Sequence, residues 1–134
     1  MSRHHYLPIP ALFATLLAGA VLAAPATAPQ EDDFDYATTQ DLYDLCAAGP
    51  DVAGNVEARF ACRAFLAATV QYHDAVTARE RLKPLICYPK STTLGDARDI
   101  FVAWGQKNAS NVEWMGERPV KGVVRALADK YPCK

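Results

Sequence analysis

Four widely spaced cysteines constrain the fold of this 134-residue chain more than any other feature. They are Cys46, Cys62, Cys87 and Cys133, and no Cys-x-x-Cys motif occurs. A zinc site is not indicated, because zinc-binding motifs place pairs of ligands only a few residues apart. The four cysteines are widely spaced, and His73 is the only histidine beyond the first five residues. An even cysteine count in a small exported chain predicts two disulfides. One of them would hold Cys133 and, with it, a chain end that normally frays.

The first 26 residues have the pattern of a cleavable export signal. A weakly basic start is followed by an apolar run over residues 9–23 and then by small residues. We expect cleavage between Ala23 and Ala26. The alternative is an uncleaved membrane anchor, which the short run disfavours because a membrane-spanning helix needs about 20 apolar residues. No second apolar stretch follows, so no membrane contact is expected after cleavage.

Charge is distributed unevenly behind this signal. Residues 27–37 are rich in proline, alanine and acidic side chains, and we expect a disordered leader there. Eight acidic residues and no lysine or arginine lie between Glu31 and Glu57, whereas basic residues outnumber acidic ones from Arg59 onward. With a net charge of -1, no nucleic-acid partner is expected. The asymmetry fits either a partner-facing surface or an ordinary acidic linker.

Helical periodicity predicts an all-α fold, a compact four-helix domain over residues 38–134, with no convincing strand. The first helix starts at Thr38 or Thr39 and stops before Gly49. The second and longest begins with Asn55 as N-cap, and Phe60, Leu66 and Val70 widen its apolar surface. The other two start near Thr93 and Arg118, the last with a proline at its first position and its end before Pro132.

The order of the helices suggests how the cysteines pair. The third and fourth helices should form an antiparallel hairpin, with Cys87 before it and Cys133 after it. Cys46 and Cys62 flank the loop between the first two helices in the same way. Loop-closure entropy does not choose among the three connectivities, because it differs by only about 1 kcal/mol between the short and the long loop. The hairpin geometry favours Cys46–Cys62 and Cys87–Cys133.

No enzyme active site is predicted, and neither a cofactor nor a metal is expected. His73 is the sole candidate base for nucleophilic catalysis, and paired cysteines would leave no thiol nucleophile. We interpret His73 as a surface or edge residue whose replacement by alanine leaves function intact. Carboxylates such as Asp96 and Asp99 are three residues apart on one helix, whereas glycosidase chemistry needs two carboxyls facing across a cleft.

Four stretches in order carry a resemblance to a known family. They are "DLYDLC", "ACRAFLAATVQYHDAV", "ICYPKSTTLGDARDIFVAW" and "RPVKGVVRALADKYPC", and the last two are the most specific. From about Thr39 to Cys133 the chain resembles the immunity proteins for type VI secretion amidase effectors, the resistance-associated protein/type VI amidase immunity family. The resemblance implies a compact helical domain that acts by binding.

The resemblance also implies a location and a partner. Such a protein stays in the periplasm and binds and blocks a secreted, peptidoglycan-cleaving amidase effector. The oligomeric state is not specified by the sequence, and a homodimer is one alternative. The alternative function is a general periplasmic stress or chaperone-like helical protein without a dedicated toxin, which would bind unfolded chains weakly and broadly.

A partner-binding surface is predicted in the loop before the fourth helix. Binding residues concentrate on loops held by rigid elements, and this loop carries an aromatic and a methionine that the helix stripes do not account for. The competing interpretation is that the tryptophan folds back as a lid over the core. We expect residues 108–117 to meet the target, with Trp114 central. The predicted contact residues are Asn108, Asn111, Glu113, Trp114 and Met115.

Overall fold

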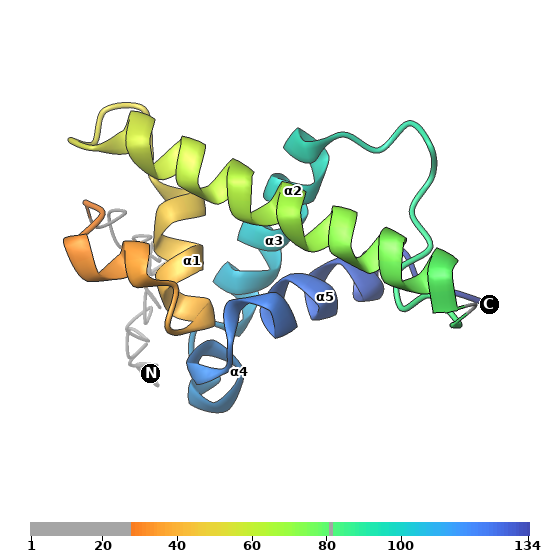
Figure 1. The fold of residues 1–134 in the computed structure, drawn as a ribbon. Coiled ribbons are helices and arrows are strands. Elements are labelled where there is room, and N and C mark those ends of the chain that lie inside the picture. The colour runs from red at the N-terminus through yellow and green to blue at the C-terminus, as the bar shows by residue number, and fades with distance from the viewer. Residues whose placement is uncertain (1–27, 81) are drawn as a thin grey trace, which may run out of the picture.

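The computed structural model describes residues 28–80 and 82–134, and these ranges fold into helices without a β-strand (Figure 1). The all-α prediction is confirmed. The predicted export signal over residues 1–26 lies outside the described residues. The helices, in chain order, are η1 (Glu31–Asp35), α1 (Thr39–Ala47), α2 (Asn55–Glu80), α3 (Leu94–Asn108), α4 (Val112–Gly116) and α5 (Pro119–Lys130).

The four predicted helices correspond to α1, α2, α3 and α5, and two short elements are additional. The one-and-a-half-turn α4 forms where we predicted a loop, because the Asn111 side chain accepts a hydrogen bond from the Trp114 amide and caps it. The 3-10 helix η1 forms within the segment predicted to be a disordered leader. Its first turn is closed by the Asp33 carboxylate, which accepts from the Gln30 amide.

Two threonines start α1 and α3 by the same local chemistry. Thr38 accepts a hydrogen bond from the Asp41 amide, and the Asp41 carboxylate accepts from the Thr38 amide. Thr93 and Asp96 repeat this capping box at the start of α3. Both pairs satisfy amides that a helix start would otherwise leave without a partner.

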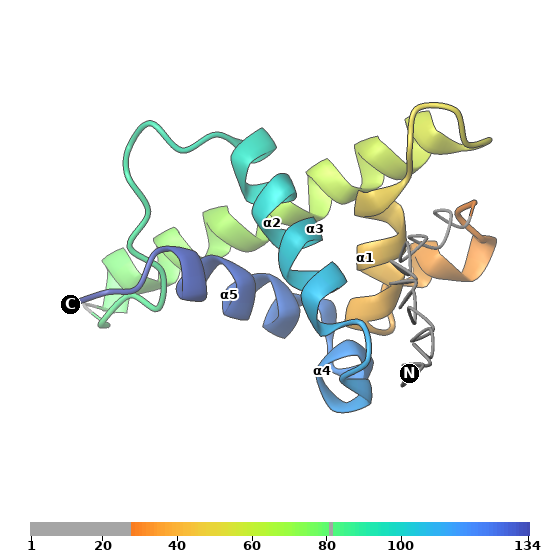
Figure 2. The same ribbon diagram turned by 180° about the vertical axis from the view of Figure 1, so that it is seen from behind.

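The long helix α2 lies across the other three main helices (Figure 1). Seen from behind, α3 runs down to α4, α5 leads away from α4, and α1 packs beside α3 and α5 (Figure 2). The core between these helices combines leucines and alanines with single larger side chains such as Phe101. Its largest fully buried apolar side chains are Leu42, Leu45, Leu66, Phe101, Val123 and Leu127.

Two glycines allow α1 to lie directly against α3 and α5. A Cβ atom on Gly122 would lie 2.3 Å from the Thr39 side chain, and one on Gly105 would lie 2.3 Å from the Tyr43 ring. Thr39 is fully buried there, and its amide donates to the Glu117 carbonyl over 2.7 Å. The start of α1 is therefore fixed to the segment that leads into α5.

The two disulfides are Cys46–Cys62 and Cys87–Cys133, the same pairs that the helix order predicts. The first joins the end of α1 to α2, and the second joins the 82–93 segment to the tail that follows α5. Beside the second bridge, the Cys87 amide donates to the Tyr131 carbonyl over 2.9 Å. The tail is thus held by a covalent bond and by a main-chain hydrogen bond.

Candidate functional site

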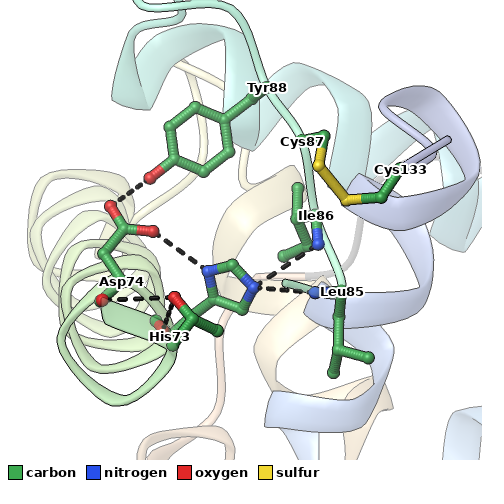
Figure 3. A network of polar contacts seen from close by, with 8 residues as sticks. His73, Asp74, Leu85, Ile86, Cys87, Tyr88 and Cys133 are labelled. Atoms are coloured by element: carbon green, nitrogen blue, oxygen red, sulfur yellow. Dashed lines mark hydrogen bonds and ion pairs between the residues drawn. A yellow bond between two sulfur atoms is a disulfide. The ribbon is translucent and has the colours of Figure 1, made fainter. Parts of the chain in front are cut away.

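His73 lies on α2 and fastens the 82–93 segment to that helix (Figure 3). Its Nε2 atom accepts from the amides of Leu85 and Ile86, over 3.2 and 3.4 Å. Because Nε2 accepts, the proton of the neutral ring is on Nδ1, which donates to the Asp74 carboxylate over 3.0 Å. The other Asp74 oxygen accepts from the Tyr88 hydroxyl.

This network is structural, and hydrogen bonds engage both ring nitrogens of His73. The imidazole side chain is only 9 % exposed, and its Nε2 atom already accepts hydrogen bonds from two main-chain amides. All four cysteines are in disulfides, so no thiol is available as a nucleophile. Burial, with a smaller contribution from the hydrogen bond to Asp74, raises the pKa of Tyr88 to about 12, so Tyr88 remains a donor at neutral pH. Sequence reasoning missed the two amides because they come from a loop twelve or more residues away.

The predicted contact segment, residues 108–117, is largely engaged within the protein. The Asn108 side-chain amide donates to the Trp104 carbonyl over 2.7 Å, and Asn111 caps α4. Met115 is only 4 % exposed and belongs to the core. Of the five predicted contact residues only Glu113 is exposed, and its neighbour Val112 is 84 % exposed.

Trp114 packs inward as the centre of a closed cluster. Its ring stacks on that of Trp104, with the two ring centroids 5.9 Å apart. The guanidinium of Arg125, which is on α5, lies 5.1 Å from the centroid of the Trp114 ring. Arg125 is itself held by the Glu117 carboxylate through nitrogen–oxygen distances of 3.0 to 3.2 Å. This hydrogen bonding lowers the pKa of Glu117. The arrangement is that of a lid over the helix ends, the competing interpretation of this tryptophan.

A groove between the first half of α2 and the first turns of α3 has the opposite character. We call it the α2–α3 groove, and its volume is about 510 Å³. Phe60, at its edge, is 70 % exposed, and Val56, one helical turn earlier, is 57 % exposed. The groove is lined by Val56, Arg59, Phe60, Arg63, Leu94, Gly95, Arg98 and Asp99.

The electrostatics of the groove are basic in a chain whose net charge is -1. Arg98 is fixed, because its Nε donates to the Cys46 carbonyl over 2.9 Å and its Nη1 lies 3.3 Å from Asp99. Arg59 and Arg63 make no hydrogen bond or ion pair among the described residues. Sequence reasoning treated Phe60 as part of the apolar surface of α2 and so missed the groove. The available signal was that Phe60 lies between two arginines, off the main stripe.

Over residues 28–80 and 82–134, no group of three or more histidine, cysteine, aspartate or glutamate side chains is arranged to hold a metal ion. No helix in that part of the chain combines the length and the hydropathy needed to cross a membrane.

Comparison with known proteins gives one match. Searches among curated proteins and among solved structures returned none. A family model described as Rap1a immunity proteins matches residues 38–133, which include α1 to α5 and both disulfides. Proteins of this family provide immunity against effectors of type VI secretion. Because the match spans well over half of the chain, the protein belongs to the Rap1a immunity family, the type VI amidase immunity family that its sequence resembles.

Proposed function

We propose that this chain is a periplasmic immunity protein that binds and blocks a peptidoglycan-cleaving amidase delivered by type VI secretion. The observation that carries the proposal is the family match over residues 38–133. An amidase that cleaves peptidoglycan acts outside the cytoplasm, so its inhibitor has to be exported to meet it. The activity of the protein is then binding alone, with no reaction of its own.

Two features of the chain support action in the periplasm. The amino-terminal 26 residues have the pattern of an export signal. Both disulfides pair all four cysteines, and disulfides persist in oxidising compartments such as the bacterial periplasm. A protein of this size also gains stability from such bridges, because its core is small.

The shape of the domain supports inhibition by a pre-formed surface. Both helices of the α2–α3 groove are tied to α1: α2 by the Cys46–Cys62 bridge and α3 by the hydrogen bond from Arg98 to the Cys46 carbonyl. A surface that is ordered before binding loses little conformational entropy when the partner arrives. Contact between the effector and residues 108–117 remains a second prediction, in which Glu113 is the exposed member.

The proposal is tested by expressing a type VI amidase effector, sought first among the reading frames that neighbour this gene, with a periplasmic export signal. Co-expression of the full chain should prevent lysis, whereas the chain without residues 1–26 should not, because it remains in the cytoplasm. Purified protein should also inhibit peptidoglycan hydrolysis at a one-to-one ratio of binding sites. Size-exclusion chromatography of the same sample shows whether the inhibitor is a monomer or a homodimer.

The outcome that contradicts the proposal is equally specific. Lysis that continues in the presence of the exported chain, together with uninhibited hydrolysis by the purified amidase, removes the immunity function. Suppression of the aggregation of several unrelated unfolded proteins would then favour the stress or chaperone-like alternative.

A further inference from the structure

We propose that the α2–α3 groove receives an acidic segment of the effector that also carries an apolar side chain. Its carboxylates would pair with Arg59 and Arg63, and its apolar side chain would pack on Phe60. This inference rests on the proposed function for the identity of the partner. The chemistry of the groove itself is argued from its own residues.

The apolar part of the groove is exposed to water, which is unfavourable in free energy, and a bound partner would cover it. Val56 and Phe60 are one turn apart on α2, so both side chains face the same way. An aromatic side chain that is 70 % exposed leaves most of its apolar surface in water. Aromatic residues and arginines are also the residue types that contribute most to binding energy in protein interfaces.

The charged part of the groove calls for carboxylates. Arg59 and Arg63 are one turn apart and lack partners among the described residues, while Arg98 provides a third guanidinium whose position is fixed. Asp99 is the single carboxylate in the lining. Guanidinium groups bind carboxylates through two parallel hydrogen bonds, which adds geometric selectivity to the attraction.

An acidic protein segment fits the groove better than a nucleic acid does. Nucleic-acid surfaces are extended and basic, whereas this groove is short and lined by three apolar side chains beside its four charged ones. The preceding part of the chain, from Glu31 to Glu57, carries eight acidic residues and no basic one. A polyanion would therefore meet repulsion from that part of the chain, which a short acidic segment seated in the groove would avoid.

The first experiment measures binding to a catalytically inactive variant of the amidase by isothermal titration calorimetry. The double variant Arg59→Glu/Arg63→Glu should bind about 100-fold more weakly than the wild-type protein, because two attractive contacts become repulsive. The control Lys107→Glu/Lys130→Glu makes the same change in net charge on exposed residues outside the groove and should bind as the wild type does. Equal loss in both double variants would reduce the effect to overall charge and overturn the proposal.

The second experiment tests the groove without the effector. Two decapeptides, one alternating glutamate with leucine and one alternating lysine with leucine, are titrated into nitrogen-15-labelled protein and followed by NMR. The glutamate peptide should shift the amide signals of residues 56–63 and 94–99, and the lysine peptide should not. Shifts that are equal for both peptides, or that are absent for the glutamate peptide, would overturn the assignment.

The two experiments separate failure of this inference from failure of the proposed function. If the wild-type protein blocks the amidase and the Arg59→Glu/Arg63→Glu variant blocks it equally well, the groove is not the contact surface although the immunity function stands. If the wild-type protein does not bind the amidase, the effector is not the occupant, even where the glutamate peptide binds. A dimer that the double variant dissociates would assign the groove to a second copy and overturn the proposal.

Discussion

Two clusters of this protein combine aromatic rings with arginine, yet they differ in what surrounds them. In the closed cluster, Trp114 stacks on Trp104, and Arg125 covers it while pairing with Glu117. In the α2–α3 groove, Phe60 is exposed, and Arg59 and Arg63 lack partners among the described residues. The closed cluster pairs its arginine with a carboxylate of the same chain, whereas the groove leaves two of its arginines without such a partner among the described residues.

The difference teaches that residue type alone does not identify a contact surface. Tryptophan and arginine are frequent hot-spot residues, and Trp114 was the natural candidate from sequence. Its contacts are nevertheless made within the chain, where they contribute to folding. The groove offers the same chemistry with its apolar surface and charges still available. We therefore expect the closed cluster to govern stability and the groove to govern binding.

The largest expected effects come from removing the disulfides. The Cys87→Ser/Cys133→Ser variant should lose about 4 kcal/mol of unfolding free energy, and the Cys46→Ser/Cys62→Ser variant about 3 kcal/mol. The loss is larger for the former because the Cys87–Cys133 bridge closes the longer loop. Only the Cys46→Ser/Cys62→Ser variant should also bind the effector more weakly per folded molecule, since Arg98 of the groove donates to the Cys46 carbonyl. Urea unfolding and calorimetry measure the two quantities. Weaker binding in the Cys87→Ser/Cys133→Ser variant would contradict the expected separation.

Truncation of the closed cluster should come next. Trp114→Ala should lower the unfolding free energy by about 3 kcal/mol, because it removes the stack on Trp104 and exposes the core beneath. Trp114→Phe keeps an aromatic ring there and should lose clearly less. An unchanged melting temperature in Trp114→Ala would show that the tryptophan is not a lid and would return it to the candidate contact residues.

The His73 network belongs to neither the closed cluster nor the α2–α3 groove, so a change there serves as a reference for both. His73→Ala should lower the unfolding free energy by about 1 to 2 kcal/mol, because the amides of Leu85 and Ile86 lose their acceptor. Protection against the amidase should be retained, since the side chain does not line the groove. Loss of protection with the melting temperature unchanged would mean that His73 has a functional role.

The smallest effect concerns the ion pair of the closed cluster and depends on pH. The Arg125 guanidinium lowers the pKa of Glu117 below its ordinary 4.5, so the pair stabilises the fold above that pH. The stabilisation is lost as pH falls through the lowered pKa. Glu117→Gln should therefore melt below the wild type at pH 7, and the gap should close at more acidic pH. Glu113→Gln, at an exposed carboxylate, is the control, and an identical pH-dependent gap there would contradict the assignment.

The sequence was sufficient to predict most of the helical framework. Capping residues such as Thr38 and Thr93 act locally, and helical periodicity reports which side chains are buried, so four helices and the cysteine pairs followed. The two additional short elements depend on local capping hydrogen bonds, such as the one from the Trp114 amide to Asn111, and such bonds leave no periodic signal.

The candidate site could not be predicted in the same way, because it is assembled from two helices. Phe60 and Leu66 both extended the apolar surface of α2 in the sequence, yet Leu66 is buried and Phe60 is exposed. Which of them is covered depends on where α3 crosses α2, and the periodicity of one helix does not contain that information. For the same reason the partners of His73 and the stack of Trp114 became visible only in three dimensions.

The most direct test of this account compares Phe60→Ala and Trp114→Ala in one titration against the inactivated amidase. The account predicts that Phe60→Ala keeps its unfolding free energy within about 0.5 kcal/mol of the wild type and binds about 30-fold more weakly. It predicts that Trp114→Ala loses stability but binds with wild-type affinity per folded molecule. The reverse result, in which Trp114→Ala loses affinity and Phe60→Ala does not, would place the contact surface on residues 108–117 and contradict the account.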